Sequence, residues 1–143
     1  MKISTKGRYA MRMLLDLAEH RGCGYISLKD IAQRQSISKK YLEQIIPILS
    51  SANVLRANRG SQGGYMLARN PDQYTVGEIL RLTEGSIIPV DCAGQECPDC
   101  ERSENCAMRG VWKGLSDAIS GYLDGITLQD ILDSEPTGGD YVI

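Results

Sequence analysis

Long hydrophobic runs are missing from this sequence of 143 residues. No stretch approaches the length of about eighteen apolar residues that a membrane-spanning helix needs. The first ten residues, MKISTKGRYA, place charged and polar side chains where a signal peptide has its apolar centre. We therefore expect no membrane association, a cytoplasmic location and cysteines that stay reduced.

Histidine is nearly absent, since His20 is the single example. The sequence pairs no nucleophile with a base, and its Gly60-x-x-Gly63-Gly64 run lacks the following Lys-Ser/Thr of a nucleotide-binding loop. These absences argue against an enzyme. His20 falls at the end of the first expected helix, where we interpret it as a charge partner of the helix terminus rather than as a ligand.

Acidic and basic residues are unevenly distributed, although the net charge is only −2. Residues 1–69 hold twelve Lys and Arg against four Asp and Glu, a balance of +8, and residues 70–143 hold four against fourteen, a balance of −10. A basic half of this density is typical of a phosphate-binding surface, and uneven charge without a function is the alternative. The length and the apolar content of 42% fit one domain, or a small binding domain with a regulatory segment.

Three helices are expected before residue 54. Residues 8–20 have apolar side chains at helical spacing, and Ser27, with Asp30 three positions later, is typical of the start of a second helix. Ser38 caps a third helix that begins KKYLEQII, in which Pro47 predicts a bend. The second and third helices, joined by a short turn, form a helix-turn-helix.

A β-hairpin is expected next, from short strands at 54–58 and 65–69 that flank a glycine-rich turn at 59–64. Three helices followed by a basic hairpin predict a winged helix-turn-helix. The expected fold class is therefore mainly α, with a small β-hairpin wing. A fourth helix follows, from the cap at Thr75 to Gly85.

A cysteine-rich loop and a long helix are expected in the C-terminal half. The long helix runs from about residue 107 to Gly125, and a short one spans 127–132. The long helix has two candidate partners, its own domain and a second copy of the chain. We favour the second copy, because such folds usually bind two half-sites as two-fold dimers. The expected organisation is a DNA-binding domain at 1–84, a cysteine loop at 85–106, and a dimerisation helix with its tail at 107–143.

Four of the five cysteines lie within fifteen residues, at Cys92, Cys97, Cys100 and Cys106. Reduced thiols at such spacing in a loop bind a metal ion or an iron-sulfur cluster more often than they form disulfides. Surface thiols that merely oxidise are the alternative. The spacing does not separate zinc from an iron-sulfur cluster, and Cys23 stands alone in a turn.

Several segments match one known family over nearly the whole chain. They are residues 4–10 (STKGRYA), 37–44 (ISKKYLEQ), the wing residues 59–60 and 63–65, residues 75–79 (TVGEI), Trp112, and residues 126–128 (ITL). The chain resembles the winged helix-turn-helix transcription regulators that include the iron-sulfur cluster regulator IscR, the nitric-oxide sensor NsrR and the cysteine-metabolism repressor CymR.

The resemblance implies a homodimeric regulator, a repressor more readily than an activator, that binds a palindromic double-stranded DNA operator. The third helix would enter the major groove and the wing the adjacent minor groove. Glu43 could there accept a hydrogen bond from a cytosine amino group. The implied DNA-binding residues are Ser38, Lys39, Lys40, Tyr41, Glu43 and Gln44 in the helix, and Arg59, Gly60, Ser61, Gln62 and Tyr65 in the wing.

The resemblance also implies ligands for a 2Fe-2S or 4Fe-4S cluster, held in some members by three cysteines that match Cys92, Cys100 and Cys106. Those members take a fourth ligand from a histidine three residues after the last cysteine, or from an acidic residue near the start of the first helix. Here Arg109 and Arg8 stand at those positions. We expect Cys97 to replace them, with water or a small thiol as the alternative.

The expected function is a transcription regulator whose operator affinity follows the state of an iron-sulfur cluster. It would report cluster supply, redox state or nitric oxide. Gain or loss of the cluster would reshape the 92–106 loop and move the dimer helix that follows it. The alternative is a cysteine-metabolism repressor whose loop binds structural zinc or senses oxidation through its thiols, and whose partner is a cysteine-biosynthesis enzyme.

Overall fold

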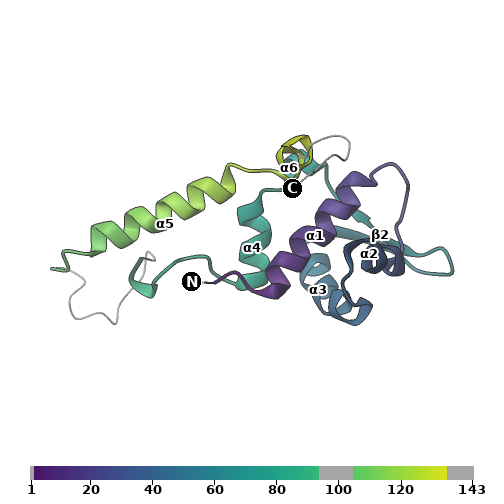
Figure 1. Ribbon diagram of the computed structural model, residues 1–143, viewed down its shortest axis with the longest axis horizontal. Helices are drawn as coiled ribbons and strands as arrows, with labels where there is room; N and C mark the ends of the chain where they lie inside the picture. The colour runs from purple at the N-terminus through teal and green to yellow at the C-terminus, as the bar shows by residue number, and fades with distance from the viewer. Residues whose placement is uncertain (1, 94–104, 135–143) are drawn as a thin grey trace, which may run out of the picture.

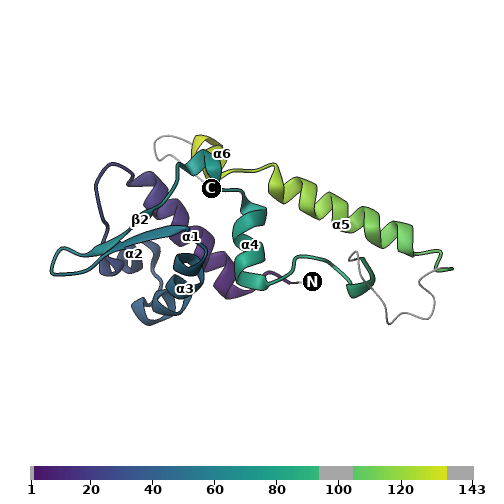
Figure 2. The ribbon, with the colours of Figure 1, turned by 180° about the vertical axis from the view of Figure 1, so that it is seen from behind.

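The computed structural model describes residues 2–93 and 105–134 (Figure 1). A rounded body is built from every element except η2 and α5, which extend away from it in both side views (Figures 1 and 2). The described part of the chain contains no helix that is long and apolar enough to cross a membrane. In chain order the elements are α1 (Thr5–Glu19), α2 (Leu28–Gln35), α3 (Lys39–Ser51), β1 (Leu55–Asn58), β2 (Gly64–Leu67), the 3-10 turn η1 (Pro71–Gln73), α4 (Val76–Glu84), the 3-10 turn η2 (Asp91–Ala93), α5 (Arg109–Asp124) and α6 (Leu128–Ser134).

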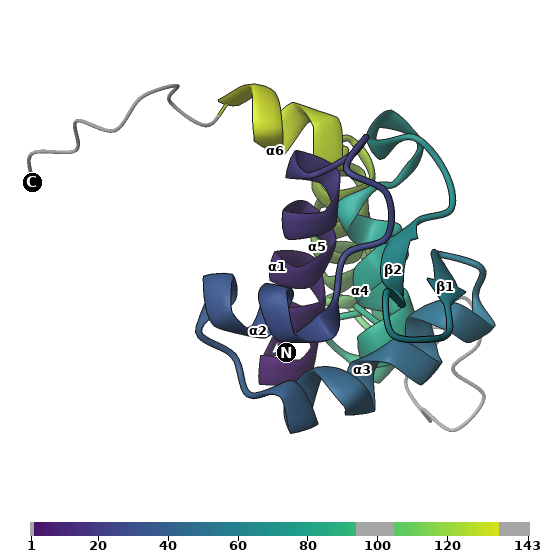
Figure 3. The same ribbon diagram turned by 90° about the vertical axis from the view of Figure 1, so that its right-hand side faces the viewer.

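The predicted fold class is confirmed. Strands β1 and β2 pair antiparallel, with Leu55 opposite Leu67 and Asn58 opposite Gly64. This hairpin follows α1, α2 and α3 as a wing follows a helix-turn-helix. Viewed end-on, α3 runs along one edge of the body, from beneath α2 to beneath the hairpin (Figure 3).

Side-chain caps fix where the helices begin. The hydroxyl groups of Ser4, Ser27, Ser38 and Thr75 each accept a hydrogen bond of 3.1 Å from the backbone N–H three residues later. The predicted caps at Ser27, Ser38 and Thr75 are confirmed. The first helix begins at Thr5, three residues earlier than predicted, because Ser4 caps it.

Helix α3 continues through Pro47 to Ser51. The ring removes the backbone donor that would serve the carbonyl group of Glu43. Because Glu43 lies on the exposed side of α3, water can take the place of that donor. The opposite side of α3 is buried in the core, where Leu42, Ile45 and Leu49 are fully covered.

Tyr74 joins the wing to the helical core. Its side chain is fully buried, and its hydroxyl group donates to the carbonyl oxygen of Val54 at 3.0 Å. The same hydroxyl accepts from the backbone N–H of Arg69 at 2.8 Å. One tyrosine therefore fixes Val54, just before β1, and Arg69, two residues after β2, which sets the base of the hairpin.

Asp16 ties α1 to the end of α2. Its carboxylate is 1% exposed and accepts from Arg34 Nη2 at 2.7 Å, from Arg34 Nε at 3.0 Å and from Gln35 Nε2 at 3.0 Å. Burial raises the pKa of this carboxyl, but the hydrogen bonds from Arg34 and Gln35 outweigh burial and hold the pKa below its ordinary value. His20 Nδ1 lies 2.8 Å from the Asp16 carbonyl oxygen, near the end of α1.

An Asp16→Asn variant tests this network. A lowered folded-state pKa stabilises the fold above the ordinary pKa of about 4, and this stabilisation is lost as pH falls through the lowered value. We expect the variant to lose about 2 kcal/mol of unfolding free energy at pH 7, and clearly less at pH 3. Urea unfolding at both pH values measures the difference, with Asp72→Asn on the exposed η1 turn as the control. An equal loss at both pH values would contradict the assigned role of the charge.

Candidate nucleic-acid interface

The turn between α2 and α3 sets the direction of α3. Ser36 adopts a left-handed conformation with φ of 53°, which ends α2 sharply. Arg12 of α1 donates to the carbonyl oxygen and to the side-chain oxygen of Gln35, beside that turn. The orientation of α3 is thus held by residues of two other helices.

The exposed face of α3 carries most of the residues predicted from the sequence. Ser38, Lys39, Lys40, Glu43 and Gln44 are all exposed. Tyr41 is half-buried, because its ring packs edge-on against Tyr9 of α1 with a centroid distance of 5.1 Å. This packing makes Tyr41 partly structural, and it places the Arg12 guanidinium group, 5.5 Å from the Tyr9 ring, close to the start of α3.

The wing presents Arg59, Gly60, Ser61 and Gln62 at its exposed tip. Gly60 has a φ of 119°, which few residues other than glycine adopt, and its carbonyl oxygen accepts from the backbone N–H of Gly63 at 3.0 Å. The tip is therefore a tight turn, and its polar side chains face solvent.

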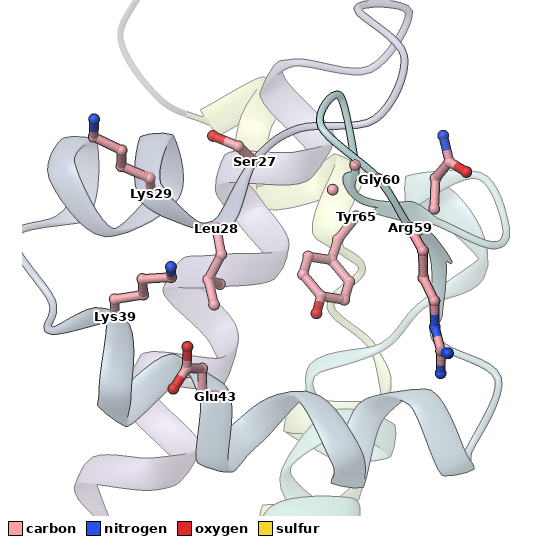
Figure 4. Close-up of a pocket in the computed structure, with 11 residues that line it drawn as sticks. Ser27, Leu28, Lys29, Lys39, Glu43, Arg59, Gly60 and Tyr65 are labelled. Atoms are coloured by element: carbon pink, nitrogen blue, oxygen red, sulfur yellow. The ribbon is translucent and has the colours of Figure 1, made fainter.

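A groove of about 440 Å³ lies between α2, α3 and the wing (Figure 4). It brings together five of the predicted residues, namely Lys39, Glu43, Arg59, Gly60 and Tyr65. The remaining predicted residues lie outside its lining, along α3 and at the wing tip. Six lining residues were not predicted, and they are Ser27, Leu28, Lys29, Asn58, Gly63 and Gly64.

Ion pairing separates the basic residues into two groups. Arg34, Arg69 and Arg81 are each paired with a carboxylate, at 2.7, 2.6 and 2.7 Å from Asp16, Glu78 and Asp124, and hydrogen bonds to those carboxylates raise the pKa of all three guanidinium groups. The cations in and beside the groove are not paired with carboxylates in this way. Lys29, Lys39, Lys40 and Arg59 form no ion pair with any residue that the structure describes. Their positive charge is available to an anionic partner.

Two of the four clustered cysteines lie in the described part of the chain. Cys92 is half-buried on η2, and Cys106 is half-buried shortly before α5. Turn η2, which carries Cys92, packs against α5, and Cys106 precedes α5 by three residues. Cys97 and Cys100 fall outside the described residues. Among residues 2–93 and 105–134, no three candidate metal ligands lie together.

Two positions that hold a histidine or an acidic ligand in similar regulators hold Arg109 and Arg8 here, which supply no ligand. Arg8 is exposed on α1 and donates to the Thr5 hydroxyl group at 3.0 Å. Arg109 begins α5. Cys23 is exposed in the turn after α1, apart from the elements that carry Cys92 and Cys106.

The end of α5 is anchored to the body. Arg81 of α4 donates from both terminal nitrogens to the two carboxylate oxygens of Asp124, at 2.7 and 2.9 Å. Gly77 of α4 faces the same carboxylate so closely that a Cβ atom would collide with it. The backbone N–H of Val76 donates to the carbonyl oxygen of Ile126 at 2.9 Å. We call the Arg81–Asp124 ion pair with Gly77 the α4–α5 clamp.

The remainder of α5 leaves a row of large apolar side chains without cover. Val111 is 54% exposed and Tyr122 is 71% exposed. Leu115 lies between them and Met108 caps the start of the helix, both on the same side and 43% exposed. Ser116 is the one buried residue of the helix. A helix with so little burial gains few stabilising contacts from its own chain.

Comparison with known proteins identifies the family. The sequence profile of the Rrf2 family, described as an iron-dependent transcriptional regulator, matches residues 3–134. The transcriptional regulator CymR of Bacillus subtilis is 42% identical over 131 residues, which cover 92% of this chain and 89% of CymR. The transcriptional regulator IscR of Aliivibrio salmonicida is 39% identical over 132 residues, which cover 92% of this chain and 77% of IscR.

A solved structure agrees with these matches. The structure of CymR, the global cysteine regulator of B. subtilis, superposes with a TM-score of 0.80 at 40% identity and covers 95% of this chain and 99% of CymR. The proteins matched are named as transcription regulators and not as enzymes. With its winged helix-turn-helix and its basic groove, the chain belongs to the Rrf2 family of bacterial DNA-binding transcription regulators.

Proposed function

We propose that this regulator binds a palindromic operator as a homodimer, with α3 in the major groove and the wing in the adjacent minor groove. The observation that carries this proposal is the set of cations on α2, α3 and the wing around one groove, which form no ion pair within the described residues. Base edges would be contacted by Ser38, Lys40, Glu43 and Gln44 on α3, with Glu43 accepting from a cytosine amino group. Arg59, Ser61 and Gln62 would enter the minor groove.

The homodimer forms through α5 in this proposal. Its row holds four of the five large apolar side chains that are exposed among the residues that the structure describes. A second α5, related by a two-fold axis, would cover that row with an identical row. The two winged domains would then face two half-sites of one operator, as the palindrome requires.

The sensing function rests on the cysteines. We propose that Cys92, Cys97, Cys100 and Cys106 hold an iron-sulfur cluster with four thiolate ligands. The iron-dependent character of the family supports this proposal, as does the packing of η2, which carries Cys92, against α5, the helix that follows Cys106. Arg8 and Arg109 cannot act as ligands, so Cys97 supplies the fourth thiolate. The 92–106 segment leads directly into α5, so a change in its ligation shifts the dimer helix and, with it, operator affinity.

Anaerobic purification tests the cysteine proposal. We expect a coloured protein that contains iron and acid-labile sulfide, and a Cys97→Ser variant that retains less than about half of the iron because one thiolate is lost. Cys23→Ser, which changes the isolated cysteine, should keep the full content. Operator affinity should differ between protein with and without the cluster. Colourless protein with stoichiometric zinc, retained in Cys97→Ser, would contradict this proposal.

The similarity to CymR favours a second candidate function, since CymR is 42% identical and is described as a global cysteine regulator. In this alternative the cysteines bind structural zinc or respond to oxidation through their thiols. The partner would be a cysteine-biosynthesis enzyme that binds the C-terminal half. Zinc in the metal analysis, together with capture of such an enzyme by the purified regulator, would select this alternative.

A further inference from the structure

The position of the groove between α3 and the wing determines which part of a bound DNA duplex would lie in it. The major and minor grooves of a duplex are separated by one sugar-phosphate strand. If α3 occupies the major groove and the wing the next minor groove, that strand must pass between α3 and the wing. The surface between them is the groove lined by Lys29, Lys39, Glu43, Arg59 and Tyr65 (Figure 4).

The walls of this groove are held together by backbone pairing. Ile26, just before α2, exchanges two hydrogen bonds with Tyr65 of β2, at 2.9 and 2.8 Å. Gly64 lies so close to the backbone of Ile26 that a Cβ atom would collide with it. The start of α2 is therefore fixed against the wing, and Lys29 keeps a constant position relative to Tyr65.

Two polar groups of the lining are unsatisfied and differ in charge. The Lys29 ammonium group forms no ion pair, and the Tyr65 hydroxyl group forms no hydrogen bond, with any described residue. In Figure 4 the Tyr65 ring projects into the groove with its hydroxyl group toward α3, and Lys29 and Lys39 stand across the groove from Arg59. An ammonium group and a phenol are both donors, and a phosphate oxygen accepts from both.

We propose that this groove binds the sugar-phosphate strand between the two DNA grooves, and that Lys29 and the Tyr65 hydroxyl group contact its phosphates. The proposal rests on the docking of α3 and the wing described above, and it assigns Lys29 a role that the sequence did not indicate. Lys29 and Tyr65 set the position of the protein on the strand. Glu43 is the one carboxylate of the lining. Because it repels phosphate, we assign it to the base edges and not to the strand.

The two contacts have different expected signatures. Lys29→Ala removes one charge in each subunit, so the slope of log affinity against log salt should decrease by about 2 for the dimer, with about tenfold weaker binding at 150 mM KCl. Tyr65→Phe removes a neutral donor, so it should weaken binding about fivefold and leave the slope unchanged. Neither group supports the described part of the fold, because Lys29 is exposed and the Tyr65 hydroxyl group has no hydrogen-bond partner among residues 2–93 and 105–134.

Fluorescence anisotropy over a series of KCl concentrations measures both signatures. The probe is a duplex of about 30 base pairs that the purified dimer selects from a random pool, long enough for two half-sites. Lys113→Ala on α5, whose charge is paired with Asp117 at 2.8 Å, is the matched control and should change neither affinity nor slope. A slope that is the same in Lys29→Ala and in the control would overturn the assignment of Lys29.

A neutral methylphosphonate placed at successive positions of the duplex tests the contact directly. At the phosphate between the two grooves, this modification should weaken operator binding by the unmodified protein. It should cause no further loss of affinity in Lys29→Ala. Additive losses at every position would contradict the proposal. If Arg59→Ala and Lys40→Ala, like Lys29→Ala, leave operator affinity unchanged, the proposed docking of α3 and the wing on DNA is wrong. If they weaken binding and Lys29→Ala does not, the docking stands and this inference alone fails.

Discussion

A Leu115→Glu variant is expected to be monomeric and to bind the selected operator at least a hundredfold more weakly. Leu115 lies in the exposed apolar row of α5, which we propose to be buried against the same row of a second subunit. A carboxylate in the centre of that interface would lose its water without gaining a partner. A monomer contacts one half-site at a time, and the affinity gained by linking two binding units, about 10²- to 10⁴-fold, is lost.

Analytical ultracentrifugation and operator titration measure the two effects on the same sample. Lys113→Glu is the control, because it introduces the same side chain on the side of α5 away from the apolar row, where Lys113 is 70% exposed. It should stay dimeric. A Leu115→Glu protein that remains dimeric would show that the subunits associate through another surface.

A Gly64→Ala variant is expected to be destabilised by about 3 kcal/mol, because its new methyl group meets backbone and not a movable side chain. The atoms that it meets belong to Ile26, which pairs with Tyr65. The start of α2 must therefore separate from the wing. The groove between α2, α3 and the wing would widen, and operator binding should fall together with stability.

Urea unfolding of the variant gives the stability loss, and anisotropy at a temperature where it remains folded gives the binding loss. Ser61→Ala, at the exposed tip of the same wing, should unfold like the unmodified protein. An unchanged unfolding midpoint for Gly64→Ala would mean that Ile26 and β2 are not paired as described.

Local features of the sequence were enough to predict the helix-turn-helix and the wing. Caps at Ser27, Ser38 and Thr75 act over three residues, and the change of period after Asn53 marks the hairpin, so neighbouring residues carry the information. Ser4 was overlooked as the first cap because the apolar pattern begins four residues later.

Contacts between distant residues could not be predicted in the same way. Ile26 and Tyr65 are far apart in the chain, and their pairing is what brings Lys29 into the groove. The Arg81–Asp124 ion pair joins residues 43 positions apart. Neither contact has a local sequence pattern, because it depends on how whole elements pack. The roles of Cys97 and Cys100, which lie outside the described residues, stay predictions.

The α4–α5 clamp fixes α5 at its C-terminal end, so the helix can tilt about Asp124. The helix has sixteen residues and hence a length of about 24 Å, so a tilt of roughly 5° at Asp124 moves the cysteine end by about 2 Å. In the proposed homodimer, a ligand change at that end would be transmitted to the winged domain as a small rotation. The ion pair at this fixed end is exposed, with Arg81 40% and Asp124 44% exposed. Rising ionic strength therefore weakens the attraction between the two side chains. The separation of the two recognition helices should therefore be more sharply defined in dilute buffer than in concentrated salt.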